Sequence, residues 1–349
     1  MDNKKKPVLN SGFIAKTSDT TLLLSITIAV FFLMYIGAMI FQGAGFLKAQ
    51  TFFNILNANA ALIVTSVGMS LVMITGGIDI SVGGVVALVC MSCAVLLDKN
   101  GGNVFQAVIL AIAIGIAYGI VQGYLVAFLD IQPFIVSLAG MFFARGMTTI
   151  VNTEPFNVSN EEFVALKSTR IHIPFLGSIN KKGVFVPAYI EIGVVVALLV
   201  VVLFFLILRW SKLGRWFYAV GGNRTSALML GINVKMTRFY AHLLCSTLAG
   251  IGGFVYFLHV GSGSASHATG MEMNAIASSI IGGTMLTGGV GNIIGTFFGV
   301  LSLSTIQNIV SSAGLDQAWW TGITIAAMLC LFLVIQSVIM SVKKKALQA

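Results

Sequence analysis

Polar residues that interrupt apolar sequence are the groups through which this chain could do chemistry. The segment TGGIDISVGG (75–84) places Asp79 and Ser81 among four glycines. A carboxylate at membrane depth is costly unless it is paired or hydrated, and broken backbone at that depth occurs only inside protein or beside water. We therefore expect a helix break near the cytoplasmic end of a membrane span. Asp79 and Ser81 would line a gate or pathway there, or Asp79 would cap the next helix.

Amide and hydroxyl side chains within the other apolar runs would suit a neutral, hydroxyl-rich solute, because they donate and accept hydrogen bonds without trapping it. The candidates for the translocation pathway are Asn57, Asn59, Gln122, His242, His259, Asn274, Ser278, Ser279, Thr284, Gln307 and Asn308. Interhelical hydrogen bonding is the alternative role, expected for about half of them. Arg145 and Glu272, in the outer third of the membrane, either form an ion pair or leave Arg145 to extend toward the headgroups.

No catalytic set is present in the sequence. It contains no H-E-x-x-H, G-x-S-x-G or Walker motif, and its four histidines lack ligand spacing. Cys90 and Cys93 lie in an apolar run without supporting ligands, which favours core packing over a metal or redox site. GGTMLTGGVGNIIG (282–295) has no preceding strand and no following lysine, so a bent or re-entrant helical hairpin is expected there instead of a phosphate loop. We predict no catalytic residue, metal or cofactor in this chain.

The amino-acid composition indicates that the helices that position these residues are surrounded by lipid. Of the 349 residues, 57% are hydrophobic and only 9% charged, whereas a soluble domain has about 25% charged residues. The sequence predicts an all-α polytopic membrane protein forming one transmembrane domain over residues 1–349. A span needs about twenty apolar residues. The expected helices are 20–42, 57–76, 80–97, 104–128, 132–151, 187–209, 237–259, 271–287, 291–312 and 318–341.

The distribution of basic residues predicts the orientation. The segments placed inside carry thirteen lysines and arginines, and the outside loops carry six, as expected when basic residues stay in the cytoplasm. This asymmetry explains the net charge of +9 without nucleic-acid binding. Both termini are expected in the cytoplasm, with a tail at 1–19, an inner loop at 211–236 and an outer loop at 152–186 that could hold a short helix.

Glycine spacing predicts close helix packing. Two spans carry a glycine at every fourth position, at 115, 119 and 123 and again at 291, 295 and 299, and small residues so spaced let helices approach in lipid. MITGG (73–77) and MLTGG (285–289) also echo each other, which hints at an internal duplication.

The largest inner loop contains a short helix signal. Asn223 is a favourable N-cap and Gly231 a favourable stop, and RTSALML between them makes about two turns. The apolar residues Leu228, Met229 and Leu230 would then face the cytosol. Such a helix docks into a groove on another protein or lies on lipid headgroups.

Four segments carry a resemblance to a known family. GGIDISVGG, AGMFFARGM (139–147), YAVGGNRTSALMLGINV (218–234) and AIASSIIGGTMLTGGVGNIIGTFFGV (275–300) resemble the permease subunits of ribose-type sugar ABC importers, over nearly the whole chain. AGMFFARGM and AWWTGITIA (318–326) look closest to the galactofuranose and galactose branch. Asp316, Gln317 and the 152–186 loop depart from the pattern, which leaves substrate and docking specificity open.

The resemblance implies a function and a set of partners. It implies import of a monosaccharide across the bacterial inner membrane, with ATP and Mg bound by a separate ABC ATPase subunit. The other partners would be a second permease subunit, identical or different, and a periplasmic sugar-binding protein on the outer loops. The implied coupling residues are Gly221, Gly222, Asn223, Arg224, Ala227, Leu228, Met229 and Gly231. The alternative is an ion-coupled secondary transporter or a channel, for which Asp79 is the candidate ion site.

Overall fold

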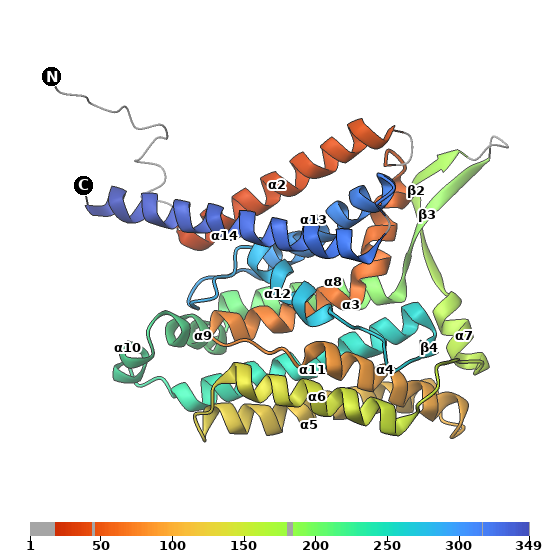
Figure 1. Cartoon of the computed structure of the whole chain (residues 1–349), viewed down its shortest axis with the longest axis horizontal. Helices are drawn as coiled ribbons and strands as arrows, with labels where there is room; N and C mark the ends of the chain where they lie inside the picture. Colours follow the sequence, from red (N-terminus) through yellow and green to blue (C-terminus); the bar gives the residue numbers. More distant parts are fainter. Residues whose placement is uncertain (1–17, 44–45, 180–183, 316, 349) are drawn as a thin grey trace.

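The computed structural model describes residues 18–43, 46–179, 184–315 and 317–348, and it is mainly helical (Figure 1). Within these ranges, eight helices are long and apolar enough to cross a membrane. They are α2 (Asp19–Gln42), α3 (Ala49–Ile74), α5 (Val104–Ala127), α6 (Pro133–Val151), α8 (Ile192–Trp210), α11 (Val234–Val260), α13 (Ile293–Ser312) and α14 (Ala318–Gln348). Helix α4 (Val82–Asp98) is equally apolar but has only 17 residues.

The eighth expected span, 271–287, is shorter than predicted. Helix α12 (Met271–Ile281) has 11 residues, which at 1.5 Å per residue is about half the thickness of the hydrocarbon core. The chain then turns through Gly283, Gly288 and Gly289, all with positive φ, a conformation that glycine adopts without steric cost. The expected bend before α13 is therefore present, but α12 alone does not reach across a membrane.

The 152–186 segment contains the expected short helix, α7 (Glu161–Ser168), and also strands that we did not predict. Strands β2 (Arg170–Ile179) and β3 (Phe185–Glu191) form an antiparallel hairpin, and β1 (Phe156–Asn157) pairs with β4 (Ser262–Gly263). Because β3 continues to Glu191, helix α8 begins at Ile192 and not at 187. Pro174 hid the hairpin, since proline argues against a strand; it lies in the irregularity between Ile173 and Gly177.

Helix α11 lies at the centre of the bundle, packed against α3, α4 and α5 (Figure 1). The first glycine series forms the α5 side of this contact, as predicted. Gly115 lies against the backbone of Ser246 and Gly250, Gly119 against Leu243 and Gly123 against Phe239. In the second series, Gly295 and Gly299 contact the carbonyl oxygens of Gly282 and Ser278, so α13 packs closely on α12.

This packing makes a testable prediction about stability. In Gly119→Ala the new Cβ would lie 2.8 Å from the Leu243 Cα, so α5 and α11 must separate. We expect a loss of about 1–3 kcal/mol of unfolding free energy, measured by denaturation in detergent. The matched control is Gly146→Ala in α6, where a Cβ meets nothing within 4 Å; there helix propensity predicts no loss. Equal effects of the two substitutions would contradict the packing argument.

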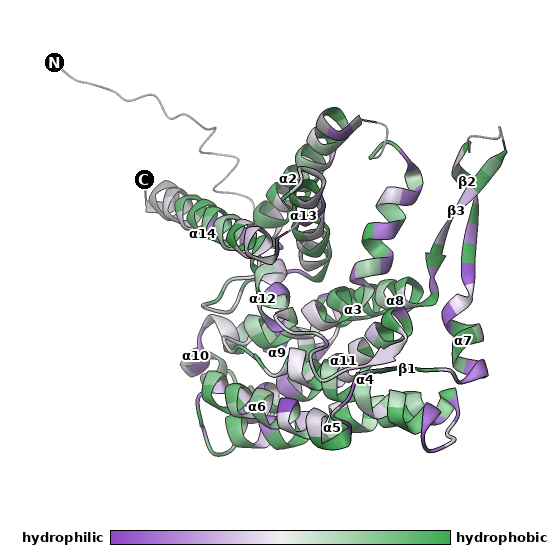
Figure 2. Cartoon of the chain, turned by 45° about the vertical axis from the view of Figure 1, so that its right-hand side comes forward, coloured by the Kyte–Doolittle hydropathy of each residue, from purple (hydrophilic) through white to green (hydrophobic). Residues whose placement is uncertain are grey.

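Hydrophilic residues gather toward the two ends of the bundle, and different segments lie at each end. Figure 1 shows α10, with the start of α2 and the end of α14, toward one end of the long helices, and the β2–β3 hairpin at the other. Figure 2 shows hydrophobic residues over most of the long helices, with hydrophilic residues at α10 and around α7. The basic loop at 211–236 and the 152–186 segment therefore lie toward opposite ends, which is the arrangement that the predicted topology requires.

Candidate functional site

The predicted inner loop, 211–236, contains two consecutive helices, α9 (Lys212–Gly222) and α10 (Arg224–Met229). The side chain of Asn223 caps α10 by accepting a hydrogen bond from the Ser226 N–H at 2.9 Å. Gly231 follows the helix with φ of +77° and donates its N–H to the Leu228 carbonyl. Both ends of the short helix are thus the residues that capping rules predict.

Helix α10 presents an apolar surface that nothing in the described chain covers. Leu228, Met229 and Leu230 are 64%, 83% and 78% exposed, whereas Ala227 is buried and fixes the inner face of the helix. Arg224, Gly222 and Asn223 are also exposed at this edge. We call Arg224, Leu228, Met229 and Leu230 the coupling surface, after the role that the sequence predicts for this loop. Three adjacent exposed apolar side chains at the end of one short helix are typical of a docking site.

Close glycine contacts join this surface to the core. A Cβ added at Gly221 would collide with the Ile74 carbonyl oxygen and lie 2.5 Å from the Gly289 nitrogen. The Gly289 N–H itself donates to the Ile74 carbonyl at 2.9 Å. The two echoing motifs, 73–77 and 285–289, therefore contact each other, and the end of α9 packs against both. We call this meeting of three backbones the glycine junction.

Tyr218 adds a side-chain link between α9 and the turn before α13. Its hydroxyl donates a hydrogen bond to the Gly291 carbonyl at 2.9 Å. Burial raises the pKa of Tyr218 to about 12, so the phenol stays neutral and keeps its proton for this bond at physiological pH. Helix α9 is therefore joined to the 282–292 turn by both backbone and side-chain contacts.

Four of the predicted pathway residues, Asp79, Ser81, Gln122 and His242, meet in one buried cluster. Asp79 Oδ1 accepts from the Ser81 N–H at 3.0 Å and the Ser81 hydroxyl at 2.6 Å, and Gln122 Nε2 donates to the same hydroxyl at 2.8 Å. The His242 Nδ1 lies 4.0 Å from Asp79 Oδ2. These two atoms and Gln122 Oε1 have no hydrogen-bond partner within the described chain. One carboxylate oxygen of Asp79 therefore stabilises the helix break before α4, and the other oxygen faces His242.

The other predicted pathway residues are dispersed. Asn57 accepts from the Glu191 N–H and so fixes the strand-to-helix junction, and Asn59 donates to the Ser304 hydroxyl at 2.6 Å. Glu191 also pairs with His259 at 2.8 Å. Exposed Asn308 donates to the Ser304 carbonyl at 2.8 Å, so it meets Asn59 at Ser304. Of the other candidates, Ser278 and Thr284 are buried, and Asn274 and Gln307 are half-buried.

One polar group was missed by the sequence reasoning. Ser70 of α3 lies 3.0 Å from the Ser279 hydroxyl of α12 and 2.6 Å from the Thr296 hydroxyl of α13. Only Ser279 of these three was a candidate. Isolated hydroxyls in apolar runs were the available signal, but only the fold shows that they come from three helices and form one interhelical contact.

Arg145 and Glu272 adopt neither of the expected arrangements. Arg145 donates to the backbone carbonyls of Ala265, His267 and Ala268, at 3.4, 2.5 and 2.9 Å. No ion pair within 4.0 Å joins it to Glu272 in the described ranges. The loop before α12 supplies enough acceptors for the guanidinium, whose five donors suit several carbonyls. Glu272 is instead buried, packed on Gly83.

An ion pair flanks the coupling surface. Arg238 of α11, four residues before His242, donates to Asp130 in the α5–α6 loop at 2.6 Å. The hydrogen bond and charge of Arg238 hold the pKa of Asp130 below its usual value. Both residues, with Arg224 and Gly76, line a cleft of about 490 Å³ that opens on this face. The ion pair therefore links α11 to the loop beside the coupling surface.

The ion pair predicts a pH-dependent contribution to stability. Because the folded-state pKa of Asp130 is lowered, its contribution is present above the unfolded-state pKa near 4 and is lost as the pH falls through the folded-state value. Asp130→Asn should lower the unfolding midpoint at pH 7 by about 1–2 °C, a modest amount since Asp130 is mostly exposed. Thermal unfolding in detergent should show the difference from wild type shrinking below about pH 4. A difference that persists there would contradict the assignment.

Comparisons with known proteins agree with this architecture. Residues 51–333 match the family described as branched-chain amino acid transport system / permease component. The chain is 36% identical to the inner membrane ABC transporter permease protein YjfF of Escherichia coli (strain K12), over 90% of this chain and 91% of that protein. It is 35% identical to the fructose import permease protein FruG of Bifidobacterium longum (strain NCC 2705), over 81% and 82%.

A third relative is the ribose import permease protein RbsC of Escherichia coli (strain K12), 33% identical over 78% of this chain and 81% of that protein. No solved structure matches the chain. By name, these relatives are an ABC transporter permease and two sugar import permeases, which are transport components. With a family match over residues 51–333 and relatives aligned over most of their length, this chain belongs to the ABC importer permease components of that family.

Proposed function

We propose that this chain is the permease subunit of an ABC importer that moves a monosaccharide into the cytoplasm, driven by ATP hydrolysis in a separate subunit. The observation that carries the proposal is the coupling surface: exposed Leu228, Met229 and Leu230 lie at the end of a capped helix that directly follows α9, and the end of α9 forms part of the glycine junction. An energy-supplying partner that binds α10 therefore acts next to α9, which is in direct backbone contact with α3 and the 282–292 turn.

The proposed mechanism separates nucleotide chemistry from transport. The partner ATPase binds ATP and Mg and displaces α10 as its two copies close. The displacement passes through Gly221 to Ile74, the last residue of α3, and to Gly289, in the turn between α12 and α13. A second permease subunit would complete the pathway, and a periplasmic sugar-binding protein would dock at the 152–186 segment. Asp79, Ser81 and Gln122 are proposed as the gate, because the helix break leaves buried polar atoms without partners.

The proposed substrate is a galactofuranose-like or related simple sugar. Support comes from AGMFFARGM and AWWTGITIA, and from relatives that import fructose and ribose by name. Uptake of labelled galactofuranose, galactose, ribose and fructose into cells expressing the complete importer would rank the sugars. Preferential uptake of ribose or fructose would overturn the galactofuranose assignment while leaving the ABC mechanism intact.

The alternative is an ion-coupled transporter, and the buried Asp79–His242 approach of 4.0 Å is the observation that favours it. Titratable groups within a membrane domain often belong to proton or ion pathways. Sugar uptake should be measured with a protonophore and, separately, after loss of the partner ATPase. The ABC proposal predicts that loss of the ATPase abolishes sugar uptake. It also predicts that the protonophore does not change uptake when cellular ATP is maintained. The opposite result would favour ion coupling.

A further inference from the structure

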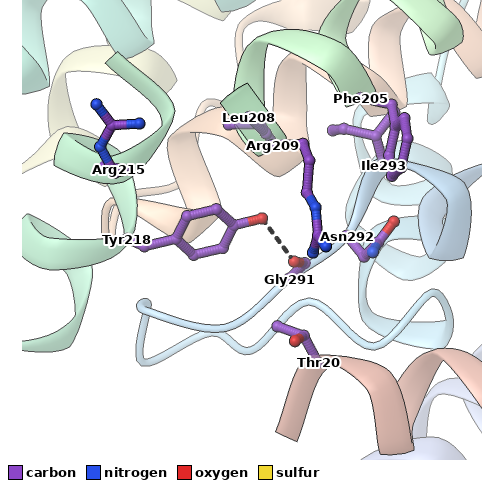
Figure 3. Close-up of a pocket in the computed structure, with 9 residues that line it drawn as sticks. All are labelled: Thr20, Phe205, Leu208, Arg209, Arg215, Tyr218, Gly291, Asn292 and Ile293. Atoms are coloured by element: carbon purple, nitrogen blue, oxygen red, sulfur yellow. Dashed lines mark hydrogen bonds between the residues drawn. The ribbon is translucent and has the colours of Figure 1, made fainter. Parts of the chain in front are cut away.

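A pocket of about 320 Å³ lies where α8, α9, the 291–293 segment and the start of α2 meet (Figure 3). Its polar lining consists of Arg209, Arg215, Tyr218, Asn292 and Thr20, and none of its nine lining residues is acidic. Figure 3 shows the Arg209 side chain extending toward Gly291 and Asn292, with Arg215 further along on α9. Asp19 adjoins Thr20 in the first turn of α2 but is not among the residues that line the pocket.

The electrostatics of this pocket favour an anion. Helices α2 and α13 both begin beside it, and each helix N-terminus carries about half a positive charge. Two acceptors at its floor are already used: the Gly291 carbonyl accepts from Tyr218, and the Asn292 side-chain oxygen accepts from the Ile294 N–H at 2.8 Å. The pocket therefore offers the Arg209 guanidinium and few free acceptors. The Arg215 guanidinium adds positive charge nearby while its Nη1 donates to the Trp210 carbonyl at 3.4 Å.

The apolar part of the lining indicates what carries the anion. Phe205, Leu208 and Ile293 also line the pocket, and Figure 3 shows them on either side of Arg209. Trp210, 69% exposed, marks the end of α8, as tryptophans do at the level of lipid headgroups. From Arg209, exposed Val202 and Leu199 lead away along α8 at helical spacing. A ligand with an anionic group at Arg209 and an acyl chain along α8 fits this arrangement. A soluble anion would contact Arg209 but would leave the exposed apolar face of α8 without a ligand.

We propose that this pocket binds the phosphate headgroup of an anionic phospholipid from the cytoplasmic leaflet, with Arg209 as the principal phosphate contact. Arg215 adds a second positive charge, and the acyl chain follows the exposed face of α8. The lipid then contacts α8, α9, α2 and the 291–293 segment, to which Tyr218 is hydrogen-bonded. It therefore stabilises the start of the loop that leads to the coupling surface. The site requires neither the sugar nor the ATPase.

The test uses the purified full chain in detergent, titrated with short-chain phosphatidylglycerol and, separately, phosphatidylcholine. Binding is read by native mass spectrometry and by the unfolding midpoint. We expect tighter binding of phosphatidylglycerol, reduced about fivefold by Arg209→Gln and about 25-fold by Arg209→Gln with Arg215→Gln. Lys212→Gln is the matched control, because Lys212 is an exposed cation between the two arginines that does not line the pocket. It should change affinity less than about twofold.

Several results would overturn the proposal. Equal binding of the two lipids by the wild-type chain would remove the anion selectivity, and this comparison requires no variant to fold. An equal loss in Lys212→Gln would indicate a diffuse charge effect. Displacement of phosphatidylglycerol by equimolar glycerol phosphate would assign the pocket to a soluble anion. If the arginine variants bind lipid normally but lose the ATPase subunit, the arginines belong to the protein interface.

Discussion

Charge reversal on the coupling surface should abolish ATP-driven uptake without unfolding the permease. In the double variant Arg224→Glu with Leu228→Asp, one substitution reverses an exposed cation and the other puts a carboxylate where an exposed leucine stands. Burying an unpaired charge in an interface is strongly unfavourable, so the ATPase subunit should no longer bind. Because both side chains are exposed and Ala227 keeps the inner face of α10, the fold should change little.

Two kinds of measurement distinguish loss of ATPase docking from loss of folded permease. Copurification of the ATPase with the permease should fall at least about tenfold, and sugar uptake should fall to background, while the permease keeps its unfolding midpoint. Lys212→Glu reverses a charge in the same loop but on α9, outside the coupling surface, and should retain both activities. Normal uptake by the double variant would mean that residues 223–231 do not receive the ATPase, and lipid contact would become the better interpretation of α10.

Local rules predicted the elements that depend on nearby residues. Asn223 and Gly231 define the ends of α10 through contacts within four residues, and the glycine series at 115, 119 and 123 predicted a close helix contact. The partner helix, α11, could not be read from that spacing, because it is set by tertiary packing. The β2–β3 hairpin was missed since Pro174 contradicts a strand locally, while the pairing across the turn compensates for it.

The sequence predicted which residue types form the candidate site, but it predicted less well which of these residues contact each other. TGGIDISVGG indicated the helix break, and Gln122 was selected as a buried amide, but their hydrogen bond spans 41 positions and follows only from the fold. Arg145 shows the opposite case. Charge complementarity suggested Glu272, whereas backbone carbonyls of a loop, which no composition pattern reveals, satisfy the guanidinium.

The glycine junction provides the second large prediction, which concerns transmission and not docking. In Gly221→Ala, the new Cβ would collide with the Ile74 carbonyl oxygen, and the Gly289 nitrogen would lie 2.5 Å away. Both are backbone atoms, so α9 must move away from the junction. The ATPase should still bind α10 and hydrolyse ATP, because the coupling surface is unchanged. Uptake should fall at least about tenfold, since a displacement near 1 Å in a positioned contact can cost that much or more.

Gly222→Ala is the matched control at the neighbouring position. A Cβ there meets nothing within 4 Å, so both ATP hydrolysis and uptake should stay near wild type. The variants are distinguished by the ratio of sugar transported to ATP hydrolysed, measured in vesicles that contain the complete importer. This ratio should fall strongly in Gly221→Ala and stay near the wild-type value in Gly222→Ala. Equal ratios would show that force does not pass through Gly221. The connection would then have to run through Tyr218 and Gly291, which Tyr218→Phe would test by removing the hydroxyl that donates to Gly291.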